Sequence, residues 1–554
     1  MAISGLDDGQ RVIHSPESVS ITLTPERMAW GFVALGVLAC SLRYALGFPL
    51  IPDEAALAMN LARLGYGGML GELQFGQMAP PGFLLLVKAC TDIFGFNEWA
   101  MRAPAFAAAV GALVLFRVLA GRVLAGWPMV IAVAVYSVSY WPLRYGAEVK
   151  PYAVDMLLSC AWLLLAHAWI EGHRPLRSML MMMALGLVGF AVSFPSVFVG
   201  GGAVLAMLAT HGLGARHRPW HGWNGRQGRL GRLVQPVVVG VCLVVGFLGT
   251  YAFLVPSRSE TAQWMVDYWQ KAFPPTDSLG SMFLWLIDVI TGELLPYPVG
   301  GENFASTGTL LFVLLGTGWL IIRRRWGLLA LLGAPIFLGL VAGFMQKYPF
   351  GQPTRLQLYL APVFCLLAGQ GLAVLLDGLQ SIIRAPAWRS PRRVALAALA
   401  LVAIATMARD VLVPHKSSTD LALREATSVL WGPARFGAPR PLSLREDLGA
   451  TFVDEPEGMH SDATRFLANF YIRVGPRAVP SAEPIDAMRP VEVVTFLVQG
   501  GFDPSLRDAW IARFQAERGL RLAGVGRLSI PHVDNRENLL RTDTIEVLRF
   551  EPAP

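Results

Sequence analysis

Charged side chains are scarce in this sequence of 554 residues. Asp, Glu, Lys and Arg make up 15% of it, while 54% is hydrophobic and the mean hydropathy is +0.48. Soluble domains are about one quarter charged, so the deficit excludes an ordinary water-soluble protein. The net charge of +7 does not indicate nucleic-acid binding, because the basic residues form short clusters between long apolar runs, as in cytoplasmic loops of membrane proteins.

Three further features are missing. The first 27 residues lack an apolar run of the signal-peptide kind, so the first apolar run is predicted to be an uncleaved span that follows a cytoplasmic N-terminus. No G-x-x-x-x-G-K-[ST] phosphate loop is present. The polar C-terminal part lacks cysteine, so neither a disulfide framework nor a cysteine metal site is predicted. The five cysteines lie within or beside apolar segments: Cys40, Cys90, Cys160, Cys242 and Cys365.

Long apolar runs dominate what is present. A helix needs about 17 to 25 apolar residues to cross a bilayer. Eleven runs qualify: 28–48, 101–119, 127–143, 152–170, 178–195, 197–213, 234–254, 304–322, 327–345, 356–376 and 393–412. A twelfth run, 81–96, is shorter and contains Lys88 and Asp92. We expect it to lie in the interface or to re-enter from one side.

The basic clusters support this topology. With the N-terminus in the cytoplasm, eleven crossings place every strong cluster in a cytoplasmic loop: Arg117 with Arg122, 171–177, 216–232, 323–325 and 384–393. Counting the twelfth run as a crossing would export most of these arginines. The accepted count leaves four polar segments together on the outer side: 49–78, 143–152, 256–303 and 346–355.

The last part of the chain has a different pattern. Residues 503–519 are amphipathic at a helical period, and 491–498 and 544–550 alternate as strands do. About 140 residues can hold a core of their own. The expected organisation is a cytoplasmic tail (1–27), a transmembrane domain (28–412) and a small extracytoplasmic α/β domain (413–554).

The first outer segment begins with the adjacent carboxylates Asp53 and Glu54. One of them can serve as a general base that takes a proton from an acceptor hydroxyl. The alternative is that both begin a helix, whose N-terminus favours acidic residues.

The second outer segment is rich in charge and aromatics, with Tyr145, Glu148, Lys150 and Tyr152, and Asp155 follows just inside the next span. These side chains can bind an anionic head group and a sugar. The alternative is anchoring at the membrane surface, which suits Lys150 and the tyrosines better than the carboxylates.

The third segment sets Lys347 and Arg355 around a turn that contains Tyr348. Two cations beside a turn can hold a phosphate, and arginine can do so with two parallel hydrogen bonds. Surface anchoring is again the alternative, and it suits Lys347 better than Arg355.

Several short sequence patterns follow one another along the chain. They are Asp53-Glu54-Ala55, Ala79-Pro80-Pro81-Gly82, Phe94 to Arg102 (Phe-Gly-x-x-Glu-x-x-x-Arg), Tyr145 to Tyr152 (Tyr-x-x-Glu-x-Lys-x-Tyr), and Tyr348 to Arg355 with Pro362. On these residues the sequence resembles the GT-C superfamily of membrane glycosyltransferases over about 28–380, in particular the branch of protein O-mannosyltransferases and lipid A aminoarabinose transferases.

The resemblance implies an enzyme of the bacterial inner membrane, and the distribution of basic clusters predicts that its site faces the periplasm. It would transfer a sugar from a polyprenyl-phosphate-linked donor to a glycan, lipid or protein acceptor, without nucleic acid as a partner. Asp53 is then the general base, and Glu54 positions it or binds sugar. The remaining candidates would bind the donor phosphate (Arg355, Lys347 and Lys150) or shape the substrate pocket (Glu148, Tyr152, Tyr348 and Tyr145).

Two departures from the family pattern matter. Ala79 stands where many relatives have His or Lys before the paired prolines, so a contact from that side chain is missing. The second segment offers Glu148 with Lys150 and not two carboxylates, so a divalent metal is allowed but not required. Two other functions stay open at this point: a flippase or transporter of lipid-linked saccharides, which breaks no bond, and a scaffold whose outer domain binds a partner.

Overall fold

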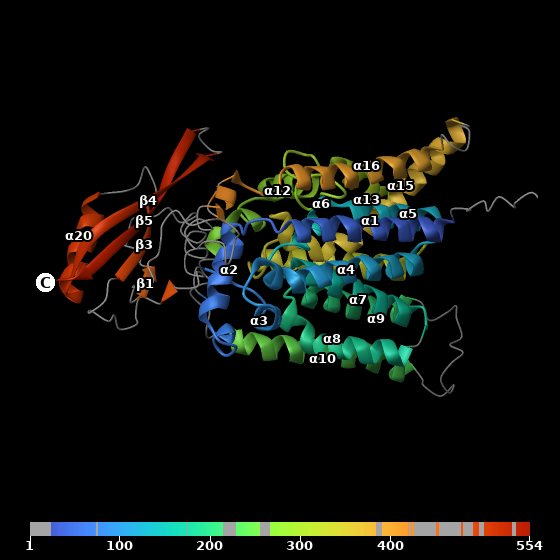
Figure 1. Cartoon of the computed structure of the whole chain (residues 1–554). Helices are drawn as coiled ribbons and strands as arrows, with labels where there is room; N and C mark the ends of the chain where they lie inside the picture. The colour runs from blue at the N-terminus through green and yellow to red at the C-terminus, as the bar shows by residue number, and fades with distance from the viewer. Residues whose placement is uncertain are drawn as a thin grey trace, which may run out of the picture.

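The computed structural model describes residues 24–73, 76–173, 175–213, 229–254, 266–383, 390–418, 420–422, 424–425, 450–453, 478–479, 491–497, 504–534 and 539–553. It shows a bundle of long helices followed by a small domain built on a sheet (Figure 1). This confirms the predicted class, a polytopic α-helical membrane protein with a C-terminal α/β domain. Most of the predicted cytoplasmic tail and parts of the basic clusters 216–232 and 384–393 lie outside the described residues.

Every expected span contains a helix. Within the described residues, eight segments are long and apolar enough to cross a membrane: α1 (Pro25–Leu46), α4 (Glu98–Val123), α7 (Tyr152–Ile170), α8 (Pro175–Val192), α10 (Arg229–Leu254), α14 (Trp326–Phe344), the 3₁₀ turn η3 (Thr354–Leu360) with α15 (Ala361–Ile383), and α16 (Pro391–Leu412). The other three expected spans form shorter apolar helices: α5 (Trp127–Val138), α9 (Ser196–Leu213) and α13 (Thr307–Ile322).

The expected span 127–143 is interrupted at Ser139. Its hydroxyl donates to the carbonyl of Val135 at 2.6 Å, and the next backbone N–H, of Tyr140, donates out of the helix to Pro298 at 3.2 Å. A short helix, α6 (Tyr140–Tyr145), follows the break. The interruption redirects the chain, so the second predicted outer segment packs against the bundle.

Among the described residues, α2, α3 and α12 are short helices outside the expected spans. α3 (Pro81–Phe94) has 14 residues, or about 21 Å of helix, which is too short for a hydrocarbon core of about 30 Å. α2 (Pro52–Arg63) begins the first outer segment. α12 (Leu279–Thr291) is an apolar helix of 13 residues within the predicted outer segment 256–303. The sequence does not single out this helix, because its apolar run is too short to stand out as a span.

The C-terminal domain holds a five-stranded sheet in the order β2-β1-β3-β5-β4. β1 (Ala450–Val453) pairs in parallel with β2 (Ala478–Val479) and β3 (Val491–Leu497), whereas β5 (Leu539–Pro552) pairs antiparallel with β3 and β4 (Leu520–Asp534). The helix α20 (Pro504–Arg518) covers the sheet with Trp510 and Phe514, which contact Phe550. Figure 1 places this domain at the end of the bundle where α2 lies, away from the start of α1.

Small residues set the closest helix crossings in the bundle. A Cβ on Gly371 of α15 would lie 1.8 Å from the carbonyl oxygen of Phe312 in α13, and one on Gly369 would lie 2.4 Å from Cα of Ala132 in α5. Lipid supplies no hydrophobic drive between helices, so such close backbone packing carries much of their association.

This packing gives a matched test on one helix. Gly371→Ala should lower the free energy of unfolding in detergent by about 1–3 kcal/mol, because the added methyl group forces α13 and α15 apart. A Cβ on Gly378 of the same helix would meet no atom within 4 Å, so Gly378→Ala should be neutral or slightly stabilising. Equal thermal melting shifts for the two variants would contradict the close crossing.

Candidate functional site

The site begins where the chain leaves α1. Gly47 has a φ of +54°, a left-handed conformation that ends α1. Pro52 then opens α2 and places Asp53 and Glu54 in its first turn. The alternative interpretation as helix-start residues therefore describes their position correctly. Their surroundings differ sharply, because the side chain of Glu54 is 1% exposed and that of Asp53 is 35% exposed.

Glu54 is an internal brace. Its carboxylate accepts hydrogen bonds from Arg102 Nη2 at 2.9 Å and Nε at 3.1 Å, and from the backbone N–H of Val149 at 2.7 Å and of Ile51 at 3.2 Å. Arg102 also donates to the carbonyl of Phe48 at 2.6 Å. This carboxylate joins α2, α4 and the segment before α7. With two oxygens engaged by four donors, Glu54 holds the site together.

Asp53 faces two cations. Lys150 Nζ lies 3.0 Å from Asp53 Oδ1, and the amide of Gln77 bridges the two residues, with Nε2 3.4 Å from Asp53 Oδ1 and Oε1 3.0 Å from Lys150 Nζ. Burial alone would raise the pKa of Asp53, but the charges of Lys150 and Arg355 outweigh it and lower that pKa to about 2. Asp53 is therefore ionised throughout the neutral range.

Arg355 reaches this group from η3. Its guanidinium lies 5.3 Å from the centre of the Trp269 ring. It interacts electrostatically with Tyr152, Asp53 and Tyr145, and it also donates a hydrogen bond to the Tyr145 hydroxyl. The rings of Tyr145 and Tyr152 meet edge to face at 4.9 Å. Five of the predicted site residues thus converge from α2, the α6–α7 segment and η3: Asp53, Lys150, Arg355, Tyr145 and Tyr152.

The other predicted residues lie at the edge of this group. Glu148 pairs with Arg144 at 2.6 Å, and both side chains are buried. The hydroxyl of Tyr348 donates to the carbonyl of Leu356 at 3.0 Å, and its ring packs on Phe198, so it supports η3. Lys347 is exposed, and no contact in the described part of the chain joins its side chain to Asp53 or Arg355.

Two residues after the last span were missed by the sequence analysis. The ammonium group of Lys416 interacts electrostatically with four charged side chains of the site region: Arg144, Glu148, Arg355 and Glu54. Asp420 is buried, and burial raises its pKa to about 7 against the opposing charge of Lys416.

The chain that carries these residues is fastened to the bundle by Arg424. Its Nη1 donates to the carbonyl of Gly47 at 2.5 Å and lies 3.8 Å from Glu98 Oε1. Single polar residues in a polar tail give no sequence signal, so only the fold places Lys416 and Asp420 here.

The side chains that surround Asp53 and could bind a ligand are mainly cationic. The described residues contain no group of three His, Cys, Asp or Glu side chains that could hold a metal, and the charged partners of Asp53 are Lys150 and Arg355. These residues suit an anionic ligand such as a phosphate.

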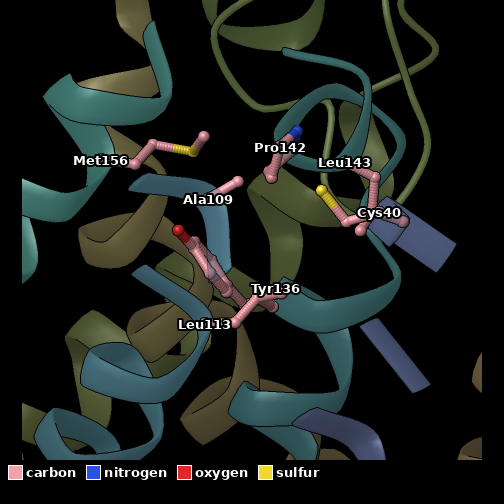
Figure 2. A pocket seen from close by; sticks show the side chains of 7 residues that line it. All are labelled: Cys40, Ala109, Leu113, Tyr136, Pro142, Leu143 and Met156. Carbon is pink, nitrogen blue, oxygen red and sulfur yellow. The ribbon is translucent and has the colours of Figure 1, made fainter. Parts of the chain in front are cut away.

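A small pocket lies deeper in the bundle, between α1, α4, α5, α6 and α7. Its lining is apolar except for the Tyr136 hydroxyl, which has no hydrogen-bond partner in the described structure (Figure 2). The lining residues are Cys40, Ala109, Leu113, Tyr136, Pro142, Leu143 and Met156. No charged group lines it, so it offers no site for an anionic ligand.

Part of the chain matches a known protein family. Residues 78–222 match the family model of dolichyl-phosphate-mannose-protein mannosyltransferases. A comparison with curated proteins gives no match.

Two solved structures have a similar chain course. ArnT from Cupriavidus metallidurans in the apo state is 14% identical with a TM-score of 0.46, over 94% of this chain and 98% of that one. The Archaeoglobus fulgidus oligosaccharyltransferase in the apo form is 13% identical with a TM-score of 0.42, over 82% of this chain and 64% of that one. The family-model match bears out the resemblance predicted from the short motifs: residues 78–222 are similar to membrane glycosyltransferases of the protein mannosyltransferase kind.

Proposed function

We propose that this protein is a glycosyltransferase that moves a sugar from a polyprenyl-phosphate-linked donor to an acceptor hydroxyl or amine at the outer face of a bacterial inner membrane. One observation carries the proposal. An ionised carboxylate, Asp53, lies beside the two cations Lys150 and Arg355, in a chain similar over residues 78–222 to enzymes that use a lipid-phosphate-linked sugar.

The geometry suggests how the residues divide the work. Asp53 takes the proton of the acceptor hydroxyl while the oxygen of that hydroxyl attacks the anomeric carbon of the sugar. The bond from that carbon to the phosphate oxygen breaks, and its electron pair stays on the phosphate. Arg355 and Lys150 stabilise the charge that grows there.

Donor binding would also activate the base. In the free protein Lys150 and Arg355 hold the pKa of Asp53 at about 2, which makes it a weak base. A phosphate that draws the same two cations toward itself would release part of this stabilisation and raise the basicity of Asp53. The base is then strongest when a donor is present.

The remaining predicted residues have supporting roles in this proposal. Glu54 positions α2 through Arg102, and Tyr145 and Tyr152 form the walls next to Arg355. Glu148 orients Arg144, and Tyr348 supports η3. Lys347, which is exposed, would attract the donor phosphate from the surface. The cations replace a divalent metal as the partner of the leaving phosphate, so no metal is required.

The experiment uses the purified full chain in detergent with a radiolabelled undecaprenyl-phosphate sugar and a crude membrane extract as acceptor. Asp53→Asn should lower transfer at least about 10³-fold while donor binding persists, because the base is lost and the cations remain. Asp92→Asn is the matched control, since Asp92 is an exposed carboxylate of α3 paired with Lys88, and it should retain full transfer.

Two results would contradict this proposal. Transfer by Asp53→Asn at the wild-type rate would remove Asp53 as the base. Donor binding by the wild type, without transfer to any acceptor fraction, would favour a flippase.

Glu54 should behave differently from its neighbour. Glu54→Gln leaves Arg102 buried without its counter-charge, which costs about 3–5 kcal/mol of stability, whereas Asp53→Asn alters a partly exposed pair. Thermal unfolding in detergent should therefore show a large loss for Glu54→Gln and a small one for Asp53→Asn. Similar losses for the two variants would mean that Glu54 is not the brace.

The lowered pKa of Asp53 also predicts a pH dependence of stability. A carboxyl whose pKa falls from 3.8 in the unfolded chain to about 2 in the folded one stabilises the fold above about pH 4 and loses this contribution as pH falls toward 2. The difference in melting temperature between wild type and Asp53→Asn should be constant from pH 5 to 8 and should shrink below pH 4. A difference that changes near pH 7 would contradict the assigned pKa.

A further inference from the structure

The Arg355 loop, residues 346–355, is held by a part of the chain that none of the motifs covers. This part, which we call the α12 segment, comprises residues 266–306 and includes the turn η2 (Gln270–Ala272) and the helix α12. The backbone N–H of Phe350 donates to the carbonyl of Ala272 at 3.0 Å. Gln352 Nε2 donates to Asp288 Oδ2 of α12 at 3.2 Å. The two segments are therefore joined at several points.

The contact between them is also close. Gly351 has a φ of +84°, and a Cβ at that position would lie 2.0 Å from Cγ1 of Val289 in α12. Only glycine can adopt this backbone conformation so near the helix. The loop that leads to Arg355 is thus pressed against α12.

Glu293 makes the joint nearest to Arg355. Its carboxylate Oε2 accepts a hydrogen bond from the backbone N–H of Thr354 at 2.7 Å, and the Thr354 hydroxyl donates to the backbone carbonyl of Glu293 at 2.9 Å. Thr354 is buried and directly precedes Arg355. A carboxylate at the first N–H of a helical turn forms a charge-assisted bond that also suits the turn dipole.

Arg355 is fixed at two other places. Its guanidinium donates a hydrogen bond to the Tyr145 hydroxyl and lies over Trp269, which belongs to the α12 segment. Its Nε has no hydrogen-bond partner in the described structure. The direction of the side chain toward Asp53 therefore depends on where Thr354 holds the backbone.

We propose that Glu293 is a positioning residue that sets Arg355 to receive the phosphate of a lipid-linked donor. This inference rests on the proposed function, because it takes the ligand of Arg355 to be that phosphate. Glu293 touches no reacting atom and acts through Thr354 and the start of η3. The α12 segment is then part of the donor site.

The test measures binding of undecaprenyl monophosphate to the full chain in detergent, with undecaprenol as the probe that lacks the phosphate. The wild type should prefer the phosphate lipid. Glu293→Ala should weaken binding of the phosphate lipid about 10-fold, as expected for loss of a charge-assisted hydrogen bond, and should leave binding of undecaprenol unchanged. Glu293→Gln keeps an acceptor for the Thr354 N–H and should restore most of the affinity.

Two further variants separate positioning from a general structural role. Arg355→Ala combined with Glu293→Ala should bind the phosphate lipid no more weakly than Arg355→Ala alone, because both changes remove one interaction. Asp288→Asn is the matched control, since Asp288 holds Gln352 of the same loop and should change the affinity less than about twofold. If Glu293→Ala does not fold, Thr354→Val removes only the hydroxyl bond and should weaken binding of the phosphate lipid about threefold.

Each contrary result has its own meaning. A wild type that prefers the phosphate lipid, together with a Glu293→Ala variant of equal affinity, would overturn the role of Glu293 and leave the proposed function standing. Independent, multiplying losses in the double variant, or an equal loss for undecaprenol, would do the same. A wild type without any preference for the phosphate would overturn both proposals.

Discussion

The buried ion pair between Glu54 and Arg102 is the interaction on which the rest of the site depends. Both side chains are almost fully buried, and removing two charges from water is worthwhile only when each is paired and hydrogen-bonded. Arg102 therefore meets both Glu54 oxygens and the carbonyl of Phe48. Because Glu54 turns inward in the first turn of α2, the preceding residue, Asp53, is directed to another side of the helix, where Lys150 is its partner.

The polar group around Asp53 is assembled from distant parts of the chain, and the charges of Lys150 and Arg355 set the pKa of Asp53. Asp53 comes from α2, Lys150 from the segment just before α7, and Arg355 from η3. In surroundings less polar than water these charges interact strongly. Under the proposed function, a donor phosphate would compete with Asp53 for the same cations, so binding of the anion and the basicity of Asp53 would be linked through electrostatics.

The sequence predicted what local composition determines. Apolar length and basic clusters predicted the helices. The same topology predicted that Asp53, Lys150 and Arg355 lie on one side of the membrane, and the structure brings these three side chains together. The break at Ser139, the helix α12 and the contact of Glu293 with Thr354 were missed. Each depends on partners far along the chain, 61 residues away in the case of Glu293, and a half-buried Glu in a loop looks like any other polar residue. The pairing of Arg102 with Glu54 also required the fold, although both residues belonged to recognised motifs.

The first turn of α4 connects the motif that contains Glu54 with the motif that contains Glu98 and Arg102. Glu98 and Arg102 are one helical turn apart, so they lie on the same side of α4. Arg102 binds Glu54 of the first outer segment, and Glu98 lies near Arg424 of the chain that follows α16. A single turn of helix therefore fastens both the segment that carries Asp53 and the segment that carries Lys416 and Asp420. Burial raises the pKa of Asp420 to about 7, whereas the pKa of Asp53 is lowered to about 2, so the two segments that this turn fastens carry carboxyls that titrate in different pH ranges. Under the proposed function, the Glu and the Arg of this pattern position the site, and the chemistry falls to the side chains that they hold in place.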